Sequence, residues 1–192
     1  MNIGLTGGMG CGKSTALGCF RNRGITVFES DRFVRDAFNR NQGLIDGLIE
    51  VFGMDVIDDE GRVDRARLAS IVFSDTSKLD ALEALVHPLV RAAWQEEVRS
   101  HQSCLVVEIP LLFEKSLEHS FDTTICVALS ASVQRQRLLE RGMTEDDIQR
   151  RLARQWTLEE KMQKADIVLM NDGSIEHLQA QVDMVLSRLA VC

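Results

Sequence analysis

The sequence predicts an α/β protein with a five-stranded parallel sheet and helices on both faces. Short apolar runs recur along the chain without alternating with polar residues, and a helical stretch follows each run. Strands buried on both faces consist of such continuous Val, Ile and Leu runs, and strand–helix alternation is typical of a doubly wound fold. The five expected strands are Asn2–Thr6, Ile25–Glu29, Leu105–Glu108, Thr123–Leu129 and Asp166–Met170.

The first expected strand leads into a phosphate-binding motif. Residues 7–14 match the pattern G-x-x-x-x-G-K-[S/T] at every fixed position. Glycines let such a loop turn tightly and point its backbone N–H groups inward, and the helix that follows adds a partial positive charge. In this loop the lysine, Lys13, reaches the β- and γ-phosphates of a nucleotide, and the hydroxyl of Ser14 ligates Mg²⁺. The expected nucleotide-binding residues are Gly8, Gly10, Cys11, Gly12, Lys13, Ser14 and Thr15.

Asp31 follows the second expected strand. Ligands of doubly wound folds bind at the carboxyl ends of the strands, where a carboxylate can orient or deprotonate an acceptor hydroxyl. The alternative is a helix N-cap, because residues 32–39 are expected to be helical. The residues alone leave both interpretations open.

A long helical stretch, about residues 32–103, separates the second and third strands. Leu44, Leu48, Ile49 and Phe52 recur at helical spacing. A single crossover does not need so much chain, so we expect a helical insertion that binds the second substrate.

A second helical stretch, about residues 131–165, separates the fourth and fifth strands, and an amphipathic helix closes the chain at about 174–189. The expected core is therefore about 1–31, 104–130 and 166–192, with a lid at about 131–165. Arginine is well suited to binding phosphoryl groups, although surface pairing with nearby acids is the more usual fate of such residues. The lid arginines are Arg135, Arg137, Arg141, Arg150, Arg151 and Arg154.

The composition excludes several classes of function. The net charge is −7 and the pI is near 5.1, which is unusual for a nucleic-acid-binding surface. No apolar run approaches the roughly 20 residues that span a bilayer, and the N-terminus does not resemble a signal peptide. Five cysteines without a C-x-x-C pair indicate reduced thiols, so we expect a cytoplasmic protein. The four histidines show no metal-ligand spacing.

Absent signatures narrow the class of nucleotide-binding protein. The chain has no N-K-x-D guanine signature and no L-S-G-G-Q motif, which argues against a GTPase and a transporter ATPase. A short chain with two helical insertions favours an ATP-dependent kinase of a small molecule.

Several motifs together resemble those of the dephospho-coenzyme A kinases, from the first residue to about Leu178. Four positions depart from the family: Met9 and Cys11 stand where isoleucine and serine are usual, and Glu29-Ser30 precede Asp31 where the family has Asp-Ala. The similar segments are residues 3–14, Asp31, residues 59–65 with Leu68 and Phe73, Leu82-Glu83, His87-Pro88, residues 110–114 (Pro-Leu-Leu-Phe-Glu), Arg137, Arg141, Gln155, Lys161, Ala165-Asp166 and Asn171.

The resemblance implies a P-loop kinase that transfers the γ-phosphoryl group of ATP to the 3′-hydroxyl of dephospho-coenzyme A, the last step of coenzyme A synthesis. It implies catalytic roles for Asp31, Lys13 and Arg141. Arg137 would then bind the nucleotide, and ATP with Mg²⁺ would be the cofactors. We expect no nucleic acid, membrane or obligate protein partner.

Other assignments keep two interpretations. Arg65 either binds an acceptor phosphate or pairs with a nearby acid, and His87 either touches the acceptor or is structural. Glu114 lies in a mostly apolar stretch that either binds the acceptor or packs beneath it. Glu108 ends an apolar strand, as an acid near Mg²⁺ would. Cys11 is either a reactive thiolate, favoured by the helix N-terminus and Lys13, or a small residue that replaces serine.

Two rival functions also fit the phosphate loop. One is a kinase of another small acceptor, such as a nucleoside monophosphate or shikimate. The other is a regulatory protein that binds ATP without transferring its phosphate. Turnover with a panel of acceptors distinguishes all three.

Overall fold

The computed structural model describes residues 1–73, 75–101 and 103–190. Cys192, which is one of the five cysteines, and the side chain of Phe73 lie outside this description. The chain divides into two compact units, one formed by Met1–Glu29 with His101–Cys192 and the other by Ser30–Ser100. In the parts described, no helix is long and apolar enough to cross a membrane.

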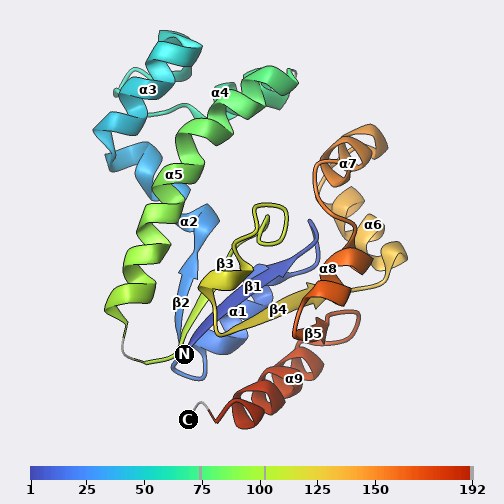
Figure 1. Ribbon diagram of the computed structural model, residues 1–192. Helices are drawn as coiled ribbons and strands as arrows, with labels where there is room; N and C mark the ends of the chain where they lie inside the picture. Colours follow the sequence, from blue (N-terminus) through green and yellow to red (C-terminus); the bar gives the residue numbers. More distant parts are fainter. Residues whose placement is uncertain (74, 102, 191–192) are drawn as a thin grey trace. The chain divides into compact units, whose positions relative to one another are not determined.

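The first unit is built on a parallel sheet with the strand order β2-β3-β1-β4-β5 (Figure 1). Every neighbouring pair is parallel, so the predicted five-stranded parallel sheet is confirmed. The bounds differ from the predicted runs by at most a residue at either end, because these runs are the buried segments of the chain. The strands are β1 (Asn2–Gly7), β2 (Thr26–Glu29), β3 (Leu105–Glu108), β4 (Thr123–Ala128) and β5 (Ile167–Met170).

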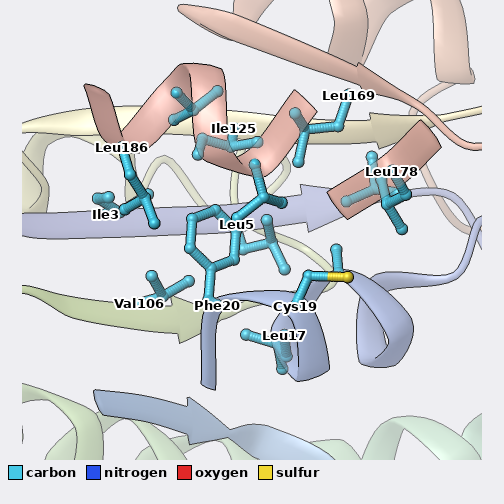
Figure 2. Packing of buried hydrophobic residues seen from close by; sticks show 14 of the residues in the cluster. Ile3, Leu5, Leu17, Cys19, Phe20, Val106, Ile125, Leu169, Leu178 and Leu186 are labelled. Atoms are coloured by element: carbon cyan, nitrogen blue, oxygen red, sulfur yellow. The ribbon is translucent and has the colours of Figure 1, made fainter. Parts of the chain in front are cut away.

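One face of the sheet is covered by α1 (Lys13–Arg21) and α9 (Ile175–Arg188), which pack against each other. Figure 2 shows Phe20 of α1 and Leu186 of α9 among the strand residues Ile3 and Leu5. Alternate strand residues point to this face, so each of the central strands contributes every second side chain to the core. This packing fixes α1, and therefore the loop that precedes it, against the sheet.

The opposite face is covered in part by α8 (Leu158–Lys164), which packs on β1 and β4. Gly4 of β1 lies on this face under the ring of Phe121, where an added Cβ would approach the ring to 2.9 Å. Helices on both faces were predicted, and this arrangement confirms the prediction.

The chain between β4 and β5 forms three short helices rather than one continuous helical stretch. They are α6 (Ala131–Glu140), α7 (Glu145–Leu152) and α8. α6 ends before Gly142, which has a φ of 78°. Thr144 caps α7 through Asp147 N–H, and Thr157 forms a capping box with Glu160 at the start of α8. These caps define new helix starts, which hydrophobic periodicity alone does not reveal.

β5 is an edge strand, and a side chain of α9 covers the backbone of its last residue. Gln181 Oε1 accepts a hydrogen bond from Met170 N at 2.8 Å, and Gln181 Nε2 donates one to Met170 O at 2.8 Å. The amide of Gln181 therefore takes the place of a neighbouring strand at this point.

The second unit, Ser30–Ser100, is helical and has its own apolar core. Leu44 and Leu48 are buried in this core, and Ile49 and Phe52 pack against it, as their spacing predicted. A turn at 58–61 joins Ile57 to Val63 in an antiparallel bridge. The elements are α2 (Ser30–Arg40), α3 (Gln42–Phe52), η1 (Met54–Val56), α4 (Arg65–Phe73) and α5 (Thr76–Ser100), which contains Pro88.

Candidate active site

The phosphate-binding loop joins β1 to α1, as the sequence predicted. Gly12 is the N-cap of α1 and has a φ of 88°, a conformation that residues with a Cβ rarely adopt. Gly12 has no side chain that could cap this helix, so it leaves the backbone N–H groups of the first turn available to an anion. The helix start therefore has the properties of a phosphate site.

The glycines also allow neighbouring groups to approach the loop closely. A Cβ on Gly12 would lie 2.1 Å from Asn171 Nδ2, and one on Gly10 would lie 2.9 Å from a methyl group of Leu138. Both positions therefore require glycine for space as well as for conformation.

Three polar side chains support the loop from outside the motif. Asn171 Nδ2 donates to Cys11 O at 2.8 Å, and Gln134 Nε2 donates to Met9 O at 2.7 Å. Arg137 in turn donates to Asn171 O at 2.9 Å. From the sequence, Asn171 was expected only as a residue similar to the family, without a role, and Gln134 was not expected to take part. Two signals could have found them: a polar residue directly after the last strand, and a glutamine on the helix that follows β4. Because the carboxyl ends of parallel strands meet at one edge of the sheet, both positions are expected to lie near the phosphate loop.

Lys13 folds back over the loop. Its Nζ donates to Gly7 O and Gly8 O, both at 3.2 Å. Ser14 and Thr15 follow on α1 and are exposed. The predicted nucleotide-binding residues thus lie in the loop and the first turn of α1, where Gly12 and Lys13 are half-buried and Ser14 and Thr15 are exposed.

Cys11 is fully buried in the core cluster rather than exposed in the loop. Burial raises the pKa of its thiol, and the charges of Lys13 and Lys161 oppose this only in part. The interpretation of Cys11 as a reactive thiolate is therefore wrong, because desolvation of the thiolate outweighs the nearby positive charge. Its backbone N–H donates to Gly8 O at 3.3 Å within the loop turn.

Two acids stand at or after the carboxyl ends of strands. Glu108 is the last residue of β3, is buried, and is in register with Leu5 of β1. Asp31 comes two residues after β2 and is exposed. α2 begins at Ser30, so Asp31 lies inside its first turn. The interpretation of Asp31 as the N-cap of a helix over residues 32–39 is therefore wrong.

The arginines after β4 differ in their surroundings. Arg137 is half-buried, and its guanidinium lies beside Gly12, 3.8 Å from the position of an added Cβ. Arg141 is exposed and is the C-cap of α6, one residue past the helix that was expected to carry both. Arg135 and Arg150 form exposed ion pairs with Glu145 and Asp147, which is the surface pairing that is usual for such arginines.

Glu114 is held by two groups. Its Oε1 lies 2.9 Å from Lys161 Nζ and accepts from Trp156 N at 2.9 Å. The ring of Phe113 stacks on Trp156 with a centroid distance of 6.2 Å. These contacts connect the loop after β3 with the chain between α7 and α8.

Arg65 and His87 belong to the helical unit. Arg65 is the first residue of α4 and is exposed, and no acid among the described residues pairs with it. The phosphate-binding role of Arg65 therefore stays a prediction. His87 is exposed on α5, directly before Pro88.

The fold and the loop define the chain as a P-loop kinase. Shikimate kinase from Bacteroides thetaiotaomicron, at 14% identity, has the same fold with a TM-score of 0.59 over 99% of this chain and 98% of that one. The profile of the dephospho-CoA kinase family matches residues 1–177, and the chain belongs to that family.

Individual relatives are similar to this chain over nearly its whole length. The dephospho-CoA kinase of Aquifex aeolicus is 37% identical over 192 residues, which cover 97% of this chain and 96% of the relative. A solved structure from Thermus thermophilus is 36% identical, with a TM-score of 0.78 over 98% of this chain and 97% of that one. ATP is accordingly a substrate of this enzyme family.

Proposed function

We propose that this chain transfers the γ-phosphoryl group of ATP to the 3′-hydroxyl of dephospho-coenzyme A and releases coenzyme A and ADP. The observation that carries the proposal is membership of the dephospho-CoA kinase family over residues 1–177. The built phosphate loop supports it independently, because a phosphoryl donor needs such a cradle.

The phosphate loop binds the donor. The uncapped N–H groups of the first turn of α1 face the β- and γ-phosphates. Lys13 exchanges its bonds to Gly7 O and Gly8 O for phosphate oxygens. Arg137 and Arg141 add positive charge that the transferring group needs most in the transition state.

Mg²⁺ fits the residues at this edge of the sheet. The exposed hydroxyl of Ser14 stands in the first turn of α1, and the carboxylate of Glu108 ends the strand beside β1. Hydroxyl and carboxylate oxygens are the ligands that this ion prefers. When bound, Mg²⁺ neutralises charge on the β- and γ-phosphates, and Ser14 with Glu108 would hold the ion or its waters.

The acceptor side rests on four residues. Asp31 orients the 3′-hydroxyl and accepts its proton as the new P–O bond forms. Arg65 binds an acceptor phosphate, and His87 with Glu114 contacts other parts of the acceptor. The helical unit Ser30–Ser100 serves as the acceptor-binding domain.

The chain between β4 and β5 acts as a lid that excludes water, which otherwise competes as an acceptor. α8 packs on the sheet and α6 supports the phosphate loop, so we assign the moving part to α7. A cytoplasmic location and the absence of an obligate protein partner stay expectations from the sequence.

An ADP-release assay with a panel of acceptors tests the function. We expect turnover with dephospho-coenzyme A and none with shikimate or nucleoside monophosphates. Efficient turnover of another acceptor would replace the substrate assignment. Tight ATP binding without turnover by any acceptor would indicate a regulatory protein instead.

A further inference from the structure

Lys161 of α8 carries an ammonium group that is completely buried. Lysine is almost never fully buried unless it is paired, because removing its charge from water costs much free energy. The residues that pair with this ammonium group should therefore indicate its role in the structure.

Both partners of Lys161 lie in the loop after β3. Its Nζ donates to Pro110 O at 2.7 Å and lies 2.9 Å from Glu114 Oε1. Pro110 O also accepts a hydrogen bond from Thr6 Oγ1 at 3.2 Å. Thr6 is buried in β1, directly before the phosphate loop. One carbonyl thus joins the phosphate-loop strand, the loop 110–114 and α8.

The carboxylate of Glu114 extends this connection to the chain between α7 and α8, residues 153–157, which ends the α7 segment (residues 145–157). Its Oε1 also accepts the N–H of Trp156, which lies between α7 and α8. Lys161 therefore fixes residue 156 and the loop 110–114 against the same strand. A charged pair with several hydrogen bonds holds one geometry more strictly than apolar packing does.

The second carboxylate oxygen is left over. Glu114 Oε2 is buried and has no hydrogen-bond partner in the parts of the chain described. Buried polar atoms are nearly always hydrogen-bonded, so an unpaired carboxylate oxygen calls for an explanation. A ligand that supplies a hydrogen-bond donor would satisfy Glu114 Oε2. The donor must be neutral or positive, because a carboxylate repels phosphate groups.

We propose that Lys161 is a positioning residue for phosphoryl transfer. It holds Glu114 as an oriented carboxylate whose Oε2 accepts a hydrogen bond from a hydroxyl or N–H group of the acceptor, away from the acceptor's phosphates. It also anchors the fixed end of the α7 segment to the phosphate-loop strand. This proposal rests on the proposed function, since it needs an acceptor molecule.

Glu114→Gln tests the carboxylate with little change of shape. The amide presents a donor where Oε2 presented an acceptor, so we expect the KM of the acceptor to rise about 10- to 100-fold, the worth of a hydrogen bond to a charged group. The KM of ATP should change by less than about 2-fold. An unchanged KM of Glu114→Gln for the acceptor would overturn the proposal.

Lys161→Met and the double variant Lys161→Met/Glu114→Gln test the positioning. Lys161→Met leaves a buried carboxylate without its counter-ion, so we expect it to lower the Tm strongly. The double variant removes both charges, so it should recover the Tm. If Lys161 acts through Glu114, the acceptor KM of the double variant equals that of Glu114→Gln. A further multiplicative rise would overturn this role, and so would full recovery of the natural KM.

Lys164→Met is the matched control. Lys164 is on the same helix and pairs with Glu118 at 3.5 Å, but its side chain is half exposed. Removing it should leave both KM values and kcat within about 2-fold, since exposed pairs contribute little. The acceptor used throughout is the one that the natural chain turns over best. Failure of dephospho-coenzyme A in that panel would overturn the proposed function, whereas unchanged KM values in the variants would overturn only the role of Lys161.

Discussion

Gly12→Ala is expected to destabilise the protein through two separate contributions. Gly12 has a φ of 88°, and a residue with a Cβ in this region costs about 1–2 kcal/mol. The new Cβ would also lie 2.1 Å from Asn171 Nδ2, so Asn171 must give up its bond to Cys11 O. Leaving a buried polar group unpaired costs about 1–3 kcal/mol. The expected loss of unfolding free energy is the sum, about 2–5 kcal/mol.

Gly24→Ala separates the two contributions. Gly24 has a φ of 77°, and among the described residues nothing lies within 4 Å of an added Cβ, so only the backbone cost applies. A chain of this length loses about 2–4 °C in Tm per kcal/mol. Gly12→Ala should therefore melt about 2–12 °C below Gly24→Ala when thermal unfolding is followed by circular dichroism.

The test is completed by introducing Gly12→Ala and Gly24→Ala into a protein that already carries Asn171→Ala. In this background the clash and the hydrogen bond are both absent, so Gly12→Ala should cost no more than Gly24→Ala. Equal melting temperatures for the two glycine variants in the natural background would refute the reasoning. They would show that Asn171 moves aside without loss and does not support the loop.

The remaining predictions concern activity and reactivity. Lys13→Ala should lower kcat/KM by about 10²–10³ with an unchanged circular dichroism spectrum; near-normal activity would contradict its role at the phosphates. Asp31→Asn should lower kcat by about 10²–10⁴ in steady-state assays, with the ATP Kd from calorimetry unchanged. A lower Tm with intact kcat would instead make Asp31 structural. Arg141→Ala should reduce kcat more than it weakens the Kd of either substrate, and the opposite pattern would make it a ground-state binding residue. Cys11 should react with iodoacetamide more slowly than a model thiol, because it is buried and its pKa is raised; faster labelling in peptide mapping would show that the loop opens.

The sequence predicted the sheet and the phosphate loop because both have local signatures. Buried parallel strands are continuous apolar runs, and the loop has fixed glycine positions beside Lys13. The contacts that support the loop were not predictable in the same way. Gln134 and Asn171 are more than 120 residues from the loop in the chain, and only the strand order brings them to it.

Contacts between residues far apart in the chain account for other features of the structure that the sequence did not predict. Lys161 and Glu114 are far apart in sequence, and no local signal indicates that their side chains pair. Cys11 stood in a motif that suggested exposure, yet its side chain points into the core, and burial outweighs the local charge. The roles of Asp31, Arg65 and His87 toward the acceptor stay predictions, because they depend on a bound substrate.

The hydrogen bonds between Gln181 and Met170 have a consequence for the behaviour of the protein at high concentration. An edge strand with free N–H and C=O groups can recruit an extended segment of another molecule and begin aggregation. At Met170 both backbone groups are already engaged by one side-chain amide. An incoming segment would have to displace Gln181 before it could pair there. This glutamine thus protects the end of the sheet from intermolecular strand addition without requiring a charge or a proline in β5.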